Sequence, residues 1–183
     1  MKRGILFAAT TALVLGITAS SCRRPADPRQ VATVDSLLTA MKAADLTLNE
    51  LDTTHYATAD SLLQGTRAKF LDRFNDTLDR TTAARLGAQF VQLREAARRA
   101  TDHQRTRSII ADGTERLGRL RNDLLAGALT DEEALKALRD ESAFAAALEQ
   151  RVMQVITTHQ ATERALDDQP LVDSLLNVTS LAR

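Results

Sequence analysis

The chain has 183 residues, and its 24 basic side chains balance its 24 acidic ones. Balanced charge gives no reason to expect a nucleic-acid partner, and five Phe, one Tyr and no Trp leave few rings on which bases could stack. Only seven Gly and three Pro interrupt a sequence rich in Ala, Leu, Arg, Glu and Gln, which are good helix formers. The composition therefore predicts an all-α fold and no nucleic-acid binding.

The N-terminal segment has the layout of an export signal. Lys2 and Arg3 precede an apolar run over residues 5–19, which is shorter than the roughly 20 residues that a comfortable membrane span needs. Small residues at positions 19–21 lead directly to Cys22, the single cysteine of the sequence. A basic start, an apolar centre and small residues before a cleavage site are typical of a secretory signal peptide, so we assign residues 1–21 to it.

With Ala-Ser-Ser-Cys at residues 19–22, this segment resembles the type-II signal peptide of bacterial lipoproteins. The match holds at the two small residues and departs at Ala19, where Leu is usual. The resemblance implies cleavage between Ser21 and Cys22, and attachment of lipid, with acyl chains such as palmitate, to Cys22 as the mature N-terminus. It also implies a location in the bacterial cell envelope, with the membrane as partner through the lipid anchor.

Two alternatives stay open for this segment: a secreted soluble protein, and a protein with an uncleaved N-terminal anchor. The position of Cys22 directly after the small residues favours modification, because a lone cysteine cannot form an intramolecular disulfide. Two or more acyl chains would anchor the protein stably, whereas one holds weakly. Arg23 stands where many inner-membrane lipoproteins carry aspartate, which favours the outer membrane.

Residues 22–30 are predicted to be the lipidated cysteine and a short extended tether, because Pro25 and Pro28 cannot lie inside a helix. Its arginines either rest on anionic headgroups or belong to a solvated linker. Residues 31–183 are then predicted to form a single domain.

Apolar residues at steps of three and four predict helix from Val31 onward. Residues 52–54, Asp-Thr-Thr, interrupt this pattern with side chains that favour caps and turns. The pattern leaves open whether residues 31–78 form one kinked helix or two.

Asp79 is a candidate N-cap for the next helix, which we expect to begin near Thr81. The apolar pattern slips in phase between His103 and Arg107, a slip that a long helix can absorb without ending. Gly127 is the predicted end of this helix, since glycine is common just past a helix C-terminus.

The clearest boundary is a capping box, in which Thr130 and Glu133 satisfy each other's backbone N–H groups. The helix that it opens runs for about 35 residues, or roughly 50 Å, with apolar residues at heptad spacing and His159 on the same face. Pro170 ends it, and the leucines from Leu171 to Leu181 predict a short terminal helix. Together these elements predict an elongated, antiparallel helical bundle of coiled-coil type with three to five helices.

Charge is distributed unevenly along the predicted helices. Residues 31–79 carry eight acids and four bases, residues 80–121 carry four acids and ten bases, and residues 122–183 carry eleven acids and five bases. An acidic, basic, acidic order suits consecutive helices that pack as neighbours. The alternative is that the basic helix faces anionic lipid or another partner.

The three histidines are the first candidates for a site. Asp52 and His55 lie at i, i+3, and His159 and Glu163 lie at i, i+4, so each pair could share a helix face. Two such pairs could build a metal site inside a bundle, but Glu-x-x-His, which a di-iron site of the ferritin kind requires twice, does not occur. Because His159 lies on the heptad face, we favour a hydrogen-bonded interfacial histidine and predict no metal ligand and no cofactor.

Catalytic motifs are absent from the sequence, which has no Gly-x-Ser-x-Gly, no glycine-rich phosphate loop, no His-Glu-x-x-His and no Cys-x-x-Cys-His. We therefore predict a non-catalytic envelope lipoprotein that serves as a structural or protein-interaction module. One alternative is a bundle that binds metal, haem or a small ligand, and another is a periplasmic chaperone or stress protein. The amphipathic helices could also pair with a protein partner or with a second copy of the chain.

Overall fold

The structure, a computed structural model, describes residues 25–73 and 79–174. Within these ranges it contains helices and no strand, which confirms the predicted all-α bundle. The signal peptide and Cys22 lie outside the described residues. The helices are α1 (Pro28–Asn49), α2 (Thr54–Arg73), α3 (Arg80–Arg94), α4 (Ala96–Ala126) and α5 (Asp131–Asp167).

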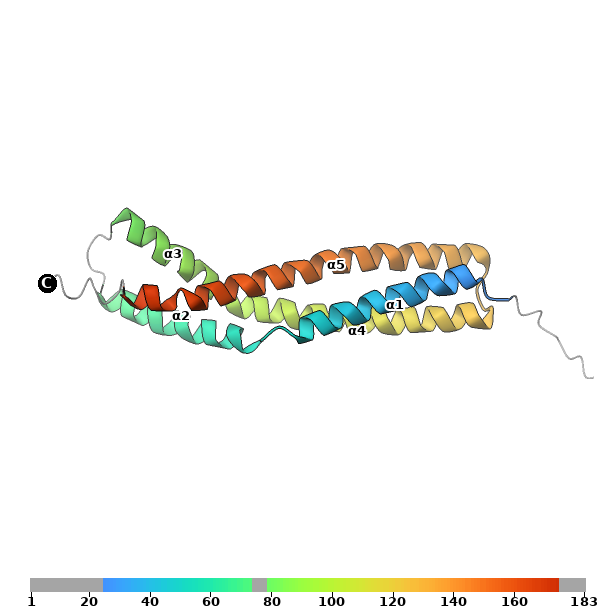
Figure 1. The fold of residues 1–183 in the computed structure, drawn as a ribbon, viewed down its shortest axis with the longest axis horizontal. Coiled ribbons are helices and arrows are strands. Elements are labelled where there is room, and N and C mark those ends of the chain that lie inside the picture. Colours follow the sequence, from blue (N-terminus) through green and yellow to red (C-terminus); the bar gives the residue numbers. More distant parts are fainter. Residues whose placement is uncertain (1–24, 74–78, 175–183) are drawn as a thin grey trace, which may run out of the picture.

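The helices form three antiparallel columns (Figure 1). α1 and α2 follow one another in the first column, α3 and α4 return in the second, and α5 alone runs the length of the third. With 37 residues, α5 is about 55 Å long. We call the end where α1 begins and α4 turns into α5 the proximal end, and the end formed by α2 and α3 the distal end.

The first column answers the question that the sequence left open: residues 31–73 form two helices, and residues 50–53 separate them. α1 also begins earlier than predicted. Asp27 is its N-cap and accepts a hydrogen bond from the Arg29 N–H at 2.8 Å. Pro28 is the first helical residue, where its missing N–H costs nothing, so the predicted tether over residues 22–30 ends at Asp27.

The second column contradicts the prediction of one helix from Thr81 to Gly127. It is broken at Glu95, between α3 and α4, whereas the helix passes through residues 103–107 without interruption. The apparent phase slip has a simple cause, because His103 and Thr106 occupy core positions and are buried there. A search for apolar residues at helical spacing does not count these two polar residues, although they continue the buried face of the helix.

The predicted helix ends are otherwise confirmed. Asp79 accepts hydrogen bonds from two N–H groups in the first turn of α3, each at 3.0 Å. Gly127 closes α4 in the left-handed conformation, with φ of 61°. The capping box before α5 is complete, with both Thr130 and Glu133 bonded reciprocally. α5 ends at Asp167, before Pro170, and residues 169–174 are again helical.

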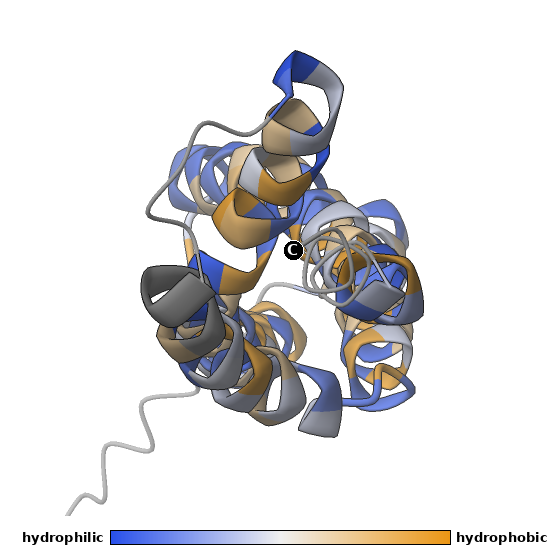
Figure 2. Ribbon diagram, turned by 90° about the vertical axis from the view of Figure 1, so that its left-hand side faces the viewer, coloured by the Kyte–Doolittle hydropathy of each residue, from blue (hydrophilic) through white to orange (hydrophobic). Residues whose placement is uncertain are grey.

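The hydrophobic core has two parts of unequal size. The larger one fills the proximal half between α1, α4 and α5, and the smaller one lies in the distal half between α2, α3, α4 and α5. Seen from the distal end, hydrophobic segments turn mainly toward the centre of the bundle and hydrophilic ones outward (Figure 2). At Gly113 the ring of Phe144 packs so close that a Cβ atom would lie 2.8 Å from it.

Ion pairs between columns explain the uneven charge of the sequence. Arg116 on α4 pairs with Glu141 on α5 at 3.0 Å, and Arg121 pairs with Asp35 on α1 at 2.6 Å. A third pair on this helix joins Arg107 to Asp45 on α1 at 3.7 Å. The basic column thus matches its acidic neighbours, as predicted. None of the helices in the described ranges is both long and apolar enough to cross a membrane.

Leu117, which is fully buried in the proximal core, should carry a large share of the stability. Replacing it by Ala is expected to lower the free energy of unfolding by about 2–5 kcal/mol, because the cavity cannot close around the smaller side chain. Leu125 on the same helix is 50% exposed, and its replacement by Ala should change stability by less than about 0.5 kcal/mol. Equal losses in urea denaturation would contradict this packing.

Candidate functional site

The three histidines of the chain meet where the first column is broken. His55 lies in the first turn of α2, His103 on α4 and His159 on α5. The ring centroids of His55 and His159 are 5.5 Å apart. Tyr56 lies edge-on to His159 and His103, with centroid distances of 5.5 and 6.1 Å. We call these four residues the histidine cluster.

Two of these histidines complete the hydrogen bonding of the broken backbone. The last carbonyl groups of a helix have no partner within it, and a carbonyl left bare in the core is costly. His103 supplies the Leu48 carbonyl of α1 with a partner at 3.1 Å. In the link after α1, the Asp52 carbonyl accepts from the His55 N–H at 3.4 Å and also from His159 at 2.9 Å. Both imidazoles are only 2% exposed. His159 is therefore the hydrogen-bonded interfacial histidine that the heptad pattern predicted.

These bonds determine which ring nitrogen carries hydrogen. A carbonyl oxygen can only accept, so the Nε2 atoms of His103 and His159 must donate. In the neutral ring the second nitrogen, Nδ1, then holds a free lone pair. For His159 this lone pair faces Glu163, one turn further along α5, whose Oε2 atom lies 3.6 Å away.

A repeated phrase marks the two capping histidines, and the sequence analysis missed it. Residues 103–106 are His-Gln-Arg-Thr and residues 159–162 are His-Gln-Ala-Thr. Both threonines are fully buried. Their hydroxyls donate to the carbonyls of Asp102 at 2.7 Å and Thr158 at 3.0 Å, four residues earlier. The recurrence of His-Gln-x-Thr on two helices is the sequence signal from which this buried polar region between α4 and α5 could have been predicted.

Each of these buried threonines also accepts a hydrogen bond from an arginine of the facing helix. Arg151 on α5 donates to Thr106 at 3.2 Å, and Arg99 on α4 donates to Thr162 at 2.9 Å. Burial lowers the pKa of Arg99, which also donates to the side chain and the carbonyl of Gln92. The layer between α4 and α5 is thus polar, internally bonded and approximately symmetric.

The hydroxyl group of Tyr56 has no hydrogen-bond partner within the described part of the chain. Its side chain is only 3% exposed, and burial raises its pKa. The ring fills the space between the two capping imidazoles. Its contribution to the site is therefore apolar packing, which keeps water from the buried bonds of His103 and His159.

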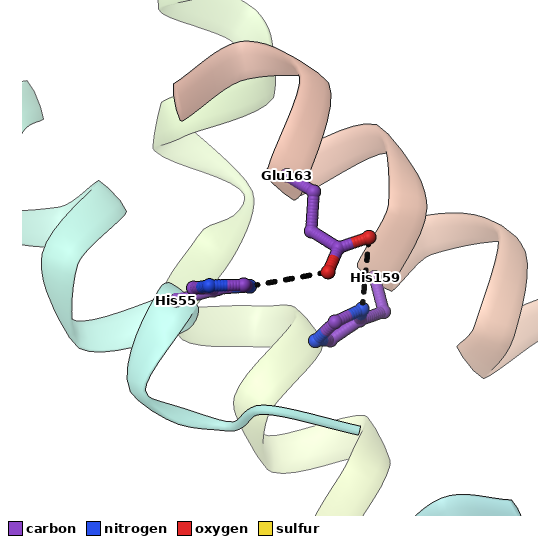
Figure 3. A group of neighbouring side chains, drawn as sticks. All are labelled: His55, His159 and Glu163. Atoms are coloured by element: carbon purple, nitrogen blue, oxygen red, sulfur yellow. Dashed lines mark ion pairs between the residues drawn. The ribbon is translucent and has the colours of Figure 1, made fainter. Parts of the chain in front are cut away.

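The structure brings together the two pairs that the sequence placed on separate helices. Glu163 lies between His55 and His159, with Oε1 3.4 Å from Nδ1 of His55 and Oε2 3.6 Å from Nδ1 of His159 (Figure 3). The other nitrogen of His55, Nε2, lies 3.5 Å from the Asp52 carboxylate. Hydrogen bonds from Thr54 lower the pKa of Asp52 and keep it ionised.

His55, His159 and Glu163 can each offer one ligand atom to a metal ion, with all three atoms within 4.8 Å of one another. We call these residues the His–His–Glu group. Sequence spacing placed His159 beside Glu163 but could not place His55, which reaches them only because α2 packs against α5. The predicted lipidation site, Cys22, and the predicted cleavage site between Ser21 and Cys22 lie outside the described residues.

The buried cap at His103 should make stability depend on pH. Burial lowers the pKa of its imidazole below the ordinary value of 6.5. As pH falls through about 6.5, the unfolded chain gains a proton on His103 that the folded chain does not accept. The free energy of unfolding therefore falls, by at most about 1.4 kcal/mol per pH unit.

Replacing His103 by Gln should remove this contribution, since an amide N–H can still donate to the Leu48 carbonyl but does not titrate. Urea denaturation at about pH 7.5, 6.5 and 5.5 measures the effect, and the variant should lose less stability on acidification than the parent. Parallel pH profiles for the two proteins would exclude this role.

Comparison with known proteins adds no family to these observations. No family model, no curated protein and no solved structure matches this chain.

Proposed function

We propose that the protein is a non-catalytic lipoprotein of the bacterial cell envelope, which holds a helical rod at a membrane and acts through the surfaces of that rod. The observation that carries the proposal is the place where α1 begins. The helix starts directly after the Pro-containing segment, at the proximal end of the bundle (Figure 1). A lipid on Cys22 would therefore hold the rod by one end.

The lengths involved support this arrangement. Four residues lie between Cys22 and the N-cap Asp27, and the five residue steps from one to the other span about 17 Å in an extended chain. The rod itself is about 55 Å long along α5. An anchor at Cys22 would keep the proximal end within a short reach of the membrane and leave the distal end free to meet partners further out in the envelope.

The distribution of charge supports this proposal. α4 carries seven arginines, and three of them pair with carboxylates of α1 and α5. Each of these pairs reduces the charge that α4 can offer to anionic headgroups. The bundle would then depend on Cys22 for membrane binding.

Cys22→Ser should accordingly release the protein from the membrane. We expect the variant to lose metabolic labelling with radioactive palmitate and to move from the membrane pellet to the soluble fraction. Ser21→Ala is the matched control, because it keeps a small residue before the cysteine and should stay labelled and membrane-bound. Labelling of the Cys22→Ser variant, or its retention in the membrane at high salt, would refute the lipid anchor.

The role as an interaction module is tested with a photo-crosslinking residue at exposed positions of the membrane-bound protein. Ala84 on α3 reports on the distal end, and Leu135 on α5 reports on the proximal end. We expect cross-links to a second polypeptide from the Ala84 position, and fewer from the Leu135 position. Absence of cross-links from both positions in native membranes would argue against a protein-interaction role.

A further inference from the structure

We propose that the His–His–Glu group is a binding site for a divalent first-row transition-metal ion such as Zn²⁺. His55 and His159 would bind the ion through Nδ1, and Glu163 through its carboxylate. The site goes beyond the proposed envelope role, and it departs from the sequence-based expectation of no metal ligand. It rests on the packing of α2 against α5, which the sequence pattern did not predict.

The orientation of the two imidazoles is the first argument. Asp52 occupies the Nε2 side of both rings, through its carbonyl for His159 at 2.9 Å and through its carboxylate for His55 at 3.5 Å. A metal-binding histidine almost always donates its other N–H to a carbonyl or carboxylate in this way. Both Nδ1 atoms are thereby directed toward Glu163 (Figure 3).

The second argument is the lack of a donor at the centre of the group. When both rings are neutral and carry their hydrogen on Nε2, the side of Asp52, two lone pairs and a carboxylate face one another, and all of them are acceptors. The Nδ1 atom of His55 is buried and has no hydrogen-bond partner within the described residues. A cation placed between the three side chains would satisfy all of these acceptors together.

The distances fit such a cation. Zn²⁺ binds imidazole nitrogen and carboxylate oxygen at about 2.0–2.2 Å in tetrahedral geometry, so two neighbouring ligand atoms lie about 3.3–3.5 Å apart. The two Nδ1–carboxylate distances are 3.4 and 3.6 Å. All three ligand atoms lie within 4.8 Å of one another, so side-chain adjustments of up to about 1 Å would bring them to this spacing.

The site is also accessible. The side chains of His55 and Glu163 are 31% and 42% exposed, whereas His159 is 2% exposed. The buried imidazole of His159 is a ligand held in place by its hydrogen bond to the Asp52 carbonyl. The side chains of the other two ligands, His55 and Glu163, border solvent. An ion can therefore enter from the surface, and water can fill the coordination position that the protein leaves open.

The donor set decides the class of metal. Two imidazoles and one carboxylate suit Zn²⁺ and other first-row transition ions, whereas Mg²⁺ and Ca²⁺ prefer ligand sets made of oxygen. The group contains no thiolate, which softer ions such as Cu⁺ prefer. Zn²⁺ is therefore the appropriate probe, because it has no redox chemistry to complicate the measurement.

Metal binding would also link parts of the bundle. His55 belongs to α2, and His159 and Glu163 belong to α5, so an ion would hold the start of the distal half against the longest helix. The distal core is the smaller of the two. Since a ligand that binds only the folded state stabilises it, Zn²⁺ should raise the thermal unfolding temperature.

The test uses the lipidated full chain in detergent, without a polyhistidine tag and stripped with chelator. Equilibrium dialysis against Zn²⁺ should give one ion per chain. His55→Gln and Glu163→Gln should each raise the dissociation constant at least tenfold and abolish the thermal shift. Glu149→Gln removes the same charge from an exposed position of α5 and should bind Zn²⁺ like the parent.

Circular dichroism of each variant separates loss of metal from loss of fold. Glu163→Gln is the decisive change, because it keeps the side-chain shape and the bond between His159 and Asp52. The assignment is overturned if the parent shows no saturable binding, or if Glu163→Gln and His55→Gln bind Zn²⁺ as tightly as the Glu149→Gln control. Neither result would affect the lipid anchor, which is measured by membrane fractionation.

Discussion

The structure depends on the hydrogen bonds that backbone carbonyl groups receive at the junction between α1 and α2. A break inside a bundle exposes carbonyl groups to a core that offers no water, and each one needs a donor. His103 and His159, from the two other columns, donate to the carbonyls of Leu48 and Asp52. These bonds tie the three columns together at one level, and they explain why two polar rings occupy positions that the heptad pattern would fill with leucine.

The same bonds prepare the chemistry of the candidate metal site. Because the carbonyl of Asp52 holds Nε2 of His159, the lone pair on Nδ1 is directed toward Glu163. Because the carboxylate of Asp52 lies beside Nε2 of His55, that ring is turned in the same sense. One residue in the α1–α2 link thus sets the orientation of both imidazoles. A structural capping role and a metal-binding role therefore support each other in this cluster.

Local signals in the sequence were sufficient for most of the helix ends. Asp79, Gly127 and the pair Thr130–Glu133 act within a few residues of their own position, so their roles depend on local backbone geometry. The break at Glu95 was missed because no proline, glycine or turn-forming run marks it. The phase slip near His103 was misplaced because the pattern scored a buried histidine as polar and therefore as exposed.

The sequence by itself determined the helical fold, the order of the columns and the charge matching between them, because periodicity, caps and net charge are properties of short segments. It also placed Asp52 three residues before His55 and His159 four residues before Glu163, although Asp52 lies in the α1–α2 link and not on α2. Only the tertiary structure decided that these pairs meet, since their contact spans 107 residues between His159 and Asp52 and depends on α2 packing beside α5. No local sequence pattern predicts a contact between residues so far apart in the chain, because the contact forms only when the three columns pack around a common core.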